Sequence, residues 1–390
     1  MRYLDNSATT PVAAAVVEAM LPYLGAEFGN PSSNSDLGQR ARAAIEGGRE
    51  QVATLVGSKP SEVVFTSGAT ESCFHAIVGA ARAVRHKRHV VISAVEHPAV
   101  SKAVSFLEGM CDIRVTVVPV EKGGTLNLDR VFDSIEIDTF LLSFMAANNE
   151  TGILFPVREL AEMARSRGIA MHTDAVQCVG KAPINFADLG VDLLSLTGHK
   201  FGGPKGVGAL VVREGAAWHP VMIGGGQEGG RRGGTESAAL AVALGKAAEL
   251  CSQRLADDHE PARLAAARDE FERQLSHTIS NIKINGHGSP RLPQISSLVV
   301  EGTIASELIQ ALLAEGIYVS AGSACKAGGM VPSHVLTAMG VPALDSFATV
   351  RFSFAPEFRI EEVPGLVAEI APIIEKVRAA GRAAMEMRRS

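Results

Sequence analysis

The most informative stretch of this chain is VVFTSGATES, residues 63–72. Its first four residues are β-branched or aromatic and predict a short strand. Ser67-Gly68 ends that strand, and a helix is expected to open near Thr70. A glycine-containing turn that leads into a helix presents free backbone N–H groups and a positive dipole end, which suits a phosphate. The same residues could also form an ordinary helix N-cap, because Ser and Thr are common there.

The alternation of short apolar strands and helices continues on both sides of this stretch. A helix is expected over 157–167, where apolar residues recur at helical spacing and Gly168 supplies the stop. Several strands are apolar throughout, as expected of strands that are covered on both faces. The pattern therefore predicts an α/β fold with a mostly parallel sheet. The further strands are expected at 90–93, 115–118, 140–145, 169–172, 193–196 and 207–212.

The last third of the chain has a different pattern. We expect a large domain over 16–254 and a smaller α+β domain made of 1–15 and 255–390. Near the boundary, the segment 224–234 is rich in glycine, and its composition alone favours a flexible surface loop. The expected elements are a helix-rich stretch over 236–278, strands near 296–300, 317–320 and 348–354, and a final helix near 361–387.

Composition excludes several classes of protein. The 390 residues include 37 Lys and Arg against 42 Asp and Glu, which gives a net charge of −5. No positive field would attract nucleic acid or an anionic membrane, so no direct binding to either is expected. No apolar run approaches the ~18 residues of a membrane span. The N-terminus lacks the regions of a signal peptide, so a cytoplasmic location is expected.

The five cysteines are an odd number and show no Cys-x-x-Cys or zinc-ligand spacing. We therefore expect neither a disulfide framework nor a resident metal site. Cys325 lies in AGSACKAGG, a run of small residues without apolar periodicity, and is expected to be the reactive thiol. Inert burial is expected for the others, which are Cys73, Cys111, Cys178 and Cys251.

Polar residues follow the predicted strands at the edge of the sheet where ligands gather. His97 could stack on a planar ligand or move a proton, or be an ordinary surface histidine. Asn149 could bind a ligand hydroxyl or simply form a turn. Asp174 could pair with a protonated ring nitrogen, and Lys200 could lose its proton in a covered site and form a Schiff base. With the phosphate cradle, these parts match the needs of pyridoxal 5′-phosphate (PLP).

Nine motifs together resemble the NifS/IscS-like cysteine desulfurases, a group within the class V aminotransferases. The resemblance extends from residue 3 to about residue 355. It implies a PLP-dependent transferase fold of the aspartate aminotransferase type. The motifs, in chain order, are DNSATTP (5–11), GNPSS (29–33), TSGATES (66–72), EH (96–97), NNE (148–150), DAVQ (174–177), GHK (198–200), RGGTE (232–236) and GSAC (322–325).

The resemblance also implies a role for each motif residue. Lys200 would bind PLP covalently, His97 would stack on its ring and assist proton transfers, and Asp174 would face the ring nitrogen. Gln177 and Asn149 would contact the ring oxygen, and the phosphate would be held by Ala69, Thr70, Thr197, Gly198 and His199. Thr235 would reach the phosphate of the other subunit of a homodimer. Arg351 would bind the substrate carboxylate, and Asn149 and Asn34 would also contact the substrate.

The implied activity is cysteine desulfuration. L-Cysteine would become L-alanine, and its sulfur would pass to Cys325 as a persulfide, then to an acceptor such as an iron–sulfur scaffold protein. Transfer-RNA and DNA thiolation are other destinations, and an iron–sulfur cluster could contact Cys325. Two alternatives stay open: another PLP enzyme such as a selenocysteine lyase, C–S lyase or aminotransferase, or a non-catalytic scaffold, which the acidic balance of charge disfavours.

Overall fold

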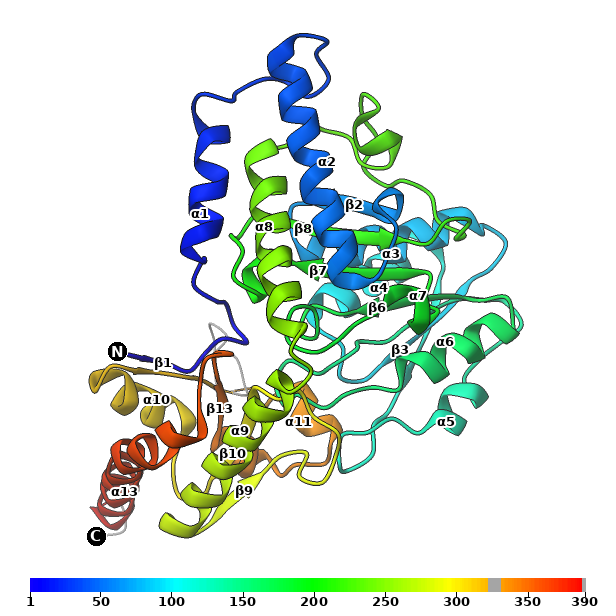
Figure 1. Ribbon diagram of the computed structural model, residues 1–390. Helices are drawn as coiled ribbons and strands as arrows, with labels where there is room; N and C mark the ends of the chain where they lie inside the picture. The colour runs from blue at the N-terminus through cyan, green and yellow to red at the C-terminus, as the bar shows by residue number, and fades with distance from the viewer. Residues whose placement is uncertain (322–330, 388–390) are drawn as a thin grey trace.

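A seven-stranded sheet lies at the centre of the larger part of the molecule (Figure 1). The computed structural model describes residues 1–321 and 331–387. Only β8 runs against the other strands of this sheet, so the predicted mostly parallel α/β fold is confirmed. The order of strands is β2 (Val63–Thr66), β8 (Gly208–Val212), β7 (Leu193–Thr197), β6 (Ala170–Asp174), β5 (Thr139–Ser143), β3 (His89–Ser93) and β4 (Arg114–Val118).

Helices cover both faces of the large sheet, which explains why its strands are apolar throughout. In β3, Val90 and Ile92 pack with the helices of one face, whereas Val91 packs with those of the other. Every residue of β2, β3, β5, β7 and β8 is buried, and β6 is buried except at Ala170, whereas most of the edge strand β4 is partly or fully exposed. One face carries α3 (Ala69–Ala83) and α4 (Pro98–Cys111), and the other carries α2 (Asp36–Val56), α6 (Val157–Ser166) and α8 (Ala238–Leu255).

A second, four-stranded sheet forms the centre of the smaller part. The N-terminal residues join this part, since β1 (Arg2–Tyr3) pairs with β11 (Ile317–Tyr318) and Leu4 enters its core. Both chain termini lie on this side of the molecule (Figure 1). The sheet order is β12 (Ser320–Ala321), β13 (Thr349–Ser353), β10 (Ile295–Val300) and β9 (Ile282–Ile284), and α9 (Glu260–Thr278), α10 (Ala305–Ala314) and α13 (Val363–Met387) pack on it.

The hydrophobic cores do not divide at a single position of the chain. Beyond residue 255, Leu292, Ile295, Val335 and Met339 pack into the core of the large sheet. The division into a large domain over 16–254 and a smaller domain over 1–15 and 255–390 stays a prediction. The helices of the described part do not combine the length and the hydropathy of a membrane span.

The glycine-rich segment 224–234 is anchored to the large sheet. Arg49 of α2 donates two hydrogen bonds, of 2.7 and 2.9 Å, to the carboxylate of Glu228, and both side chains are buried. Arg232 donates to Glu71 at 2.8 Å. Glycine content favoured a flexible surface loop, but these charged residues between the glycines fix the segment against α2 and α3.

The prediction of burial is wrong for one cysteine. Cys111 is exposed, because it is the last residue of α4 at a helix end that faces solvent. Cys73, Cys178 and Cys251 are buried as free thiols.

Candidate active site

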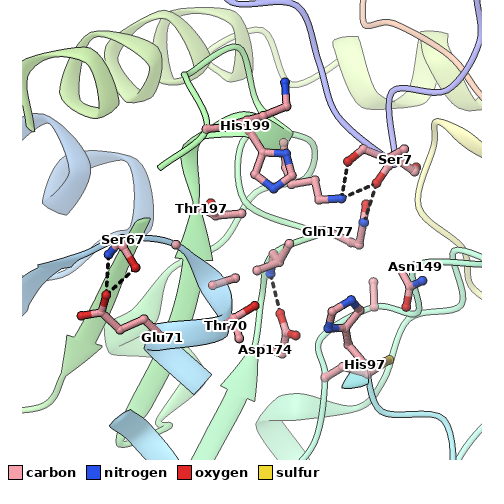
Figure 2. A pocket seen from close by; sticks show the side chains of 18 of the residues that line it. Ser7, Ser67, Thr70, Glu71, His97, Asn149, Asp174, Gln177, Thr197 and His199 are labelled. Carbon is pink, nitrogen blue, oxygen red and sulfur yellow. Dashed lines mark hydrogen bonds between the residues drawn. The ribbon is translucent and has the colours of Figure 1, made fainter. Parts of the chain in front are cut away.

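A cavity of about 530 Å³ lies where the loops after the strands of the large sheet meet the N-terminal segment and β13 (Figure 2). Its position agrees with the general rule that ligands gather at the carboxyl ends of strands in open α/β sheets. Ten of the residues predicted from the sequence line it, and they are Ala69, Thr70, His97, Asn149, Asp174, Gln177, Thr197, His199, Lys200 and Arg351.

One end of the cavity is formed by the start of α3. Within the described part of the chain this helix has no side-chain cap at its N-cap residue, so its first backbone N–H groups can meet an anion. Its N-cap residue, Gly68, has φ of +149°, a conformation that favours glycine. A Cβ on the neighbouring Gly208 would lie 2.9 Å from Gly68 Cα, so Gly208 is needed for the close approach of β8 to this turn.

Lys200 ends a short turn, Gly198–Lys200, directly after β7. Its Nζ donates hydrogen bonds of 2.6 and 2.7 Å to the carbonyl oxygens of Ser7 and Ala8. Burial, together with the nearby Arg351 guanidinium, lowers the pKa of Lys200 to about 8. The amine is therefore held in place by neutral acceptors and loses its proton more easily than an exposed lysine.

Asp174 is the last residue of β6 and is buried at the floor of the cavity. Its Oδ1 accepts a hydrogen bond of 3.0 Å from the backbone N–H of Val176. Among the described residues, its Oδ2 has a hydrogen-bond partner only in the thiol of Cys73, at 3.9 Å. Burial raises the pKa of Asp174, and the adjacent His97 and Lys200 oppose that shift. A buried carboxylate with an acceptor oxygen to spare is suited to a cationic ring nitrogen.

Two histidines line the cavity in neutral form at neutral pH. His97 caps α4, because its Nδ1 accepts from the backbone N–H of Ala99 at 3.1 Å, which leaves the ring proton on Nε2. Burial lowers the pKa of His97. Burial, with the nearby lysines, also lowers the pKa of His199 to about 4, and His199 Nδ1 lies 3.2 Å from Thr9 Oγ1.

Arg351 reaches the cavity from β13 in the smaller sheet, so both parts of the molecule contribute to the site. Its Nη2 donates to Asp5 Oδ1 at 2.9 Å, and its Nη1 donates to the carbonyl oxygen of Asn149 at 2.7 Å. Its Nε is buried and has no hydrogen-bond partner in the described part of the chain. The guanidinium is thus oriented by two contacts and keeps a donor available.

The remaining predicted site residues lie outside this cavity. Gly198 forms the buried turn that precedes Lys200. Thr235 is exposed and lines a neighbouring cavity of about 240 Å³. Asn34 is exposed in the loop before α2, and the structure does not bring it to either cavity. Cys325 lies outside the described residues.

The sequence analysis assigned no role to several residues that shape the site. The carbonyls of Ser7 and Ala8 hold Lys200, although 193 and 192 positions separate them in the chain. At the rim, Glu71 accepts from both the backbone N–H and the hydroxyl of Ser67. The signal that could have found the first pair is the motif DNSATTP, but no periodicity or spacing links it to residue 200.

The groups around this cavity fit PLP. They comprise free N–H groups for a phosphate, an amine that deprotonates near neutral pH, a buried carboxylate for a ring nitrogen and a neutral imidazole for a ring face. The contacts come from the carboxyl ends of four different strands, β2, β3, β6 and β7, so groups of different chemistry surround one ligand site.

The chain is similar to known proteins over nearly its whole length. A family model described as aminotransferase class-V matches residues 2–366. Cysteine desulfurase IscS from Dictyoglomus turgidum is 43% identical over 380 residues, which cover 96% of this chain and 95% of that protein.

Solved structures are similar as well. A NifS-like protein superposes with a TM-score of 0.87 at 34% identity, with 96% of this chain and 100% of that chain covered. The structure of SspA in complex with cysteine gives a TM-score of 0.80 at 35% identity, with 91% of this chain and 99% of that chain covered.

Proposed function

This chain belongs to the class-V aminotransferase family, and we propose that it works as a PLP-dependent cysteine desulfurase. The enzyme converts L-cysteine to L-alanine and transfers the sulfur to one of its own cysteines. The observation that carries this proposal is the convergence of Lys200, Asp174 and Arg351 on one cavity. The three groups come from separate elements. The amine and the buried carboxylate serve the cofactor, and the guanidinium serves the carboxylate of the amino-acid substrate.

The cofactor is assigned to the residues whose chemistry matches it. The phosphate takes the free N–H groups at the start of α3, with Ala69 and Thr70 in the first turn. Asp174 accepts from the ring nitrogen, and His97 packs on the ring. Lys200 forms the covalent link through Nζ, where its pKa of about 8 leaves part of the amine unprotonated near neutral pH. When bound, PLP withdraws electrons from the substrate α-carbon.

Arg351 binds the substrate carboxylate. A planar guanidinium suits a carboxylate, because two parallel N–H groups can donate at once. Its Nη groups already contact Asp5 and the Asn149 carbonyl, which fixes the plane of the guanidinium, while the buried Nε has a donor to spare. Binding the carboxylate there orients the α-carbon toward Lys200.

Proton transfer is assigned to Lys200 and His97. A lysine amine with a lowered pKa can accept the α-proton at Nζ and give it back. The carbonyls of Ser7 and Ala8 accept from Nζ when it carries the proton, so they stabilise the charge that it gains. His97 holds its own ring proton at Nε2, because Nδ1 is already an acceptor in the helix cap.

Sulfur transfer is assigned to Cys325. Its thiolate attacks the substrate sulfur, an S–S bond forms, and the carbon–sulfur bond of the substrate breaks with both electrons leaving on the carbon side. That carbon takes up a proton, so L-cysteine and the enzyme thiol become L-alanine and an enzyme persulfide with no external oxidant. The outer sulfur then passes to an acceptor thiol.

The wider setting of the enzyme is also part of the proposal. It acts in the cytoplasm as a homodimer in which Thr235 of each chain reaches the phosphate site of the other. The exposure of Thr235 outside its own main cavity supports this arrangement. Iron–sulfur cluster assembly is the use of the sulfur that the names of similar proteins support.

Absorption spectroscopy tests the cofactor assignment directly. The purified wild-type protein with PLP is expected to show a visible band that persists on gel filtration, and Lys200→Ala is expected to lose it. Lys205→Ala is the matched control, since Lys205 also lines the cavity but has no assigned role in cofactor binding. A colourless wild-type protein, or an unchanged band in Lys200→Ala, would overturn the proposal.

A further inference from the structure

A second lysine is buried beside the cavity without an acidic partner. Lys181 follows β6 by seven residues and is only 8% exposed. Its Nζ donates a hydrogen bond of 3.1 Å to Oε1 of Gln177, four residues earlier in the chain. Within residues 1–321 and 331–387, no carboxylate lies at salt-bridge distance from this amine. Burying an amine in this way is unfavourable, so a specific role is to be expected.

The contact of Lys181 determines which way the Gln177 amide faces. Gln177 Oε1 accepts from Lys181. Gln177 Nε2 donates to the carbonyl oxygen of Ser7 at 3.0 Å (Figure 2). A flip of the amide would set two carbonyl oxygens against each other at Ser7 and two donor groups against each other at Lys181. In the observed orientation no acceptor in residues 1–321 and 331–387 takes the second N–H of Nε2, and Gln177 lines the cavity.

We propose that Lys181 is a positioning residue, which fixes the Gln177 amide so that it offers an N–H donor to the anionic ring oxygen of the cofactor. This inference rests on the proposed function, because it requires PLP in the cavity. Lys181 does not contact the cofactor directly, since it does not line the cavity. Lys181 acts only through its hydrogen bond to the side chain of Gln177.

The same network includes Lys200. The carbonyl of Ser7 accepts from Gln177 Nε2 and also from Lys200 Nζ, at 3.0 and 2.6 Å. The orientation of the Gln177 amide therefore affects the acceptor that holds the amine of Lys200. Burial and the nearby Lys200 lower the pKa of Lys181 to about 7, but the amine donates a hydrogen bond in either protonation state.

A structural role and a positioning role predict different effects of Lys181→Met. Methionine has a similar length and no charge, so Lys181→Met relieves the cost of burying an amine and removes the hydrogen bond to Gln177 Oε1. If Lys181 acts on the cofactor, Lys181→Met keeps or raises the unfolding temperature and changes the bound PLP. If it is only structural, the unfolding temperature falls and the cofactor is unaffected.

The experiment compares the wild-type holoenzyme with Lys181→Met, Gln177→Leu and the double variant. Two quantities are measured, the midpoint pH at which the visible band of bound PLP changes and the Kd of PLP for the apoenzyme. Loss of a hydrogen bond to a charged oxygen is expected to raise Kd about tenfold in Gln177→Leu. Lys181→Met should raise Kd and should also raise the midpoint pH, because the ring oxygen loses its fixed donor.

The double variant decides whether Lys181 acts through Gln177. Since the two residues form one unit, Gln177→Leu/Lys181→Met is expected to match Gln177→Leu alone. Additive effects, or an unchanged midpoint and Kd in Lys181→Met, would overturn the inference. So would a failure of both Lys181→Met and Lys181→Arg to fold, since that indicates a structural lysine. A wild-type protein without a PLP band would instead count against the proposed function.

Discussion

Burial shifts the pKa of most ionisable groups around the cavity toward their neutral forms. It lowers the pKa of Lys200 to about 8 and that of His199 to about 4. It raises the pKa of Glu96 to about 8 and that of Glu150 to about 7. Although hydrogen bonds with Arg232 and Ser67 lower the pKa of Glu71 at the rim, burial elsewhere reduces the negative charge around the cavity near neutral pH. This balance favours the binding of an anionic phosphate and a substrate carboxylate.

Arg351 is expected to determine affinity for the substrate. Arg351→Ala removes hydrogen bonds to a charged group, which contribute about 1.5–3 kcal/mol, so the KM for L-cysteine should rise about 10- to 100-fold. Arg351→Lys keeps the charge but not the paired N–H groups, so it should recover only part of the loss. Steady-state kinetics of alanine formation measures both, and an unchanged KM in Arg351→Ala would contradict this role.

Glu96 predicts a pH dependence of stability. Its Oε1 accepts from Ser93 Oγ and the Met145 N–H, and its Oε2 has no partner in the described part of the chain. The folded protein keeps the carboxyl proton up to a pKa of about 8, whereas the unfolded chain loses it near the ordinary value of 4.5. The folded state therefore binds more protons in this window, and wild-type stability falls as pH rises through it.

Glu96→Gln removes that dependence and keeps the acceptor oxygen. The difference in free energy of unfolding, variant minus wild type, is expected to grow from about pH 5 to about pH 8, as measured by urea unfolding. Glu108→Gln, an exposed change in α4, the helix that follows Glu96, is the matched control and should give a constant difference. A difference for Glu96→Gln that does not depend on pH would show that this carboxyl ionises normally in the folded state.

Individual site residues were predictable only where a motif carries them. His97, Asp174 and Lys200 each follow a predicted strand, so the topology of a parallel sheet already places them at one edge. The carbonyls of Ser7 and Ala8 could not be predicted, because backbone acceptors leave no mark in side-chain identity. The Lys181–Gln177 contact is also missing from the sequence reasoning, since a lysine is normally expected at the surface.

At the scale of elements, helix α11 (His334–Ala338) connects the smaller part to the active site. Its N-cap Ser333 accepts from the backbone N–H groups of Val335 and Leu336 at 3.1 and 3.2 Å. The Ser333 hydroxyl also donates to the buried carboxyl of Glu150. Next to it, His334 Nε2 lies 3.0 Å from the carbonyl oxygen of Glu96. The start of one short helix is thus fixed to two loops of the large sheet.

Ser333→Ala is expected to destabilise the protein by about 1–2 kcal/mol, because it removes a helix cap and leaves the Glu150 carboxyl without its donor. Ser333→Thr keeps the hydroxyl and should lose much less. The midpoint of denaturant unfolding measures both variants. Equal stability of the alanine variant and the wild type would show that the cap contributes little at this position.

The strands were easier to predict than the helices. An apolar run covered on both faces is visible in the sequence, so β2, β3 and β7 appear within a residue of their predicted limits. Helix α2, in contrast, was not predicted. It contains Gly48, and a Cβ there would lie 2.5 Å from the carbonyl oxygen of Ala241 in α8. Close packing of the two helices therefore requires glycine at this position, although glycine has a low helix propensity.

At the scale of the whole molecule, one surface carries an unusual number of exposed apolar side chains. They lie on α1 (Ala14–Met20), on the short helix η1 (Leu21–Leu24) and beyond it, where Phe28 is 74% and Leu24 is 65% exposed. Such a patch is typical of a surface that another chain covers. It agrees with the homodimer that we propose.

Mixing two inactive variants tests whether the second chain completes the site. If Thr235 acts on the partner's phosphate site, a hybrid of a Lys200→Ala chain and a Thr235→Val chain contains one site with both residues intact. Activity should therefore reappear when the two variants are unfolded and refolded together, and light scattering should give a mass near twice 40.9 kDa. A mixture that stays inactive while hybrids form would show that Thr235 acts within its own chain.

The most direct measurement follows a sulfur atom from L-cysteine onto the protein. The holoenzyme is incubated with L-cysteine, and its peptides are analysed by mass spectrometry while alanine is quantified. We predict one added sulfur atom on Cys325, and a Cys325→Ala variant that keeps the PLP band but forms neither persulfide nor alanine. Cys111→Ser, which removes the exposed thiol of α4, should behave like the wild type. Undiminished alanine formation in Cys325→Ala, or sulfur on another cysteine, would contradict the assignment.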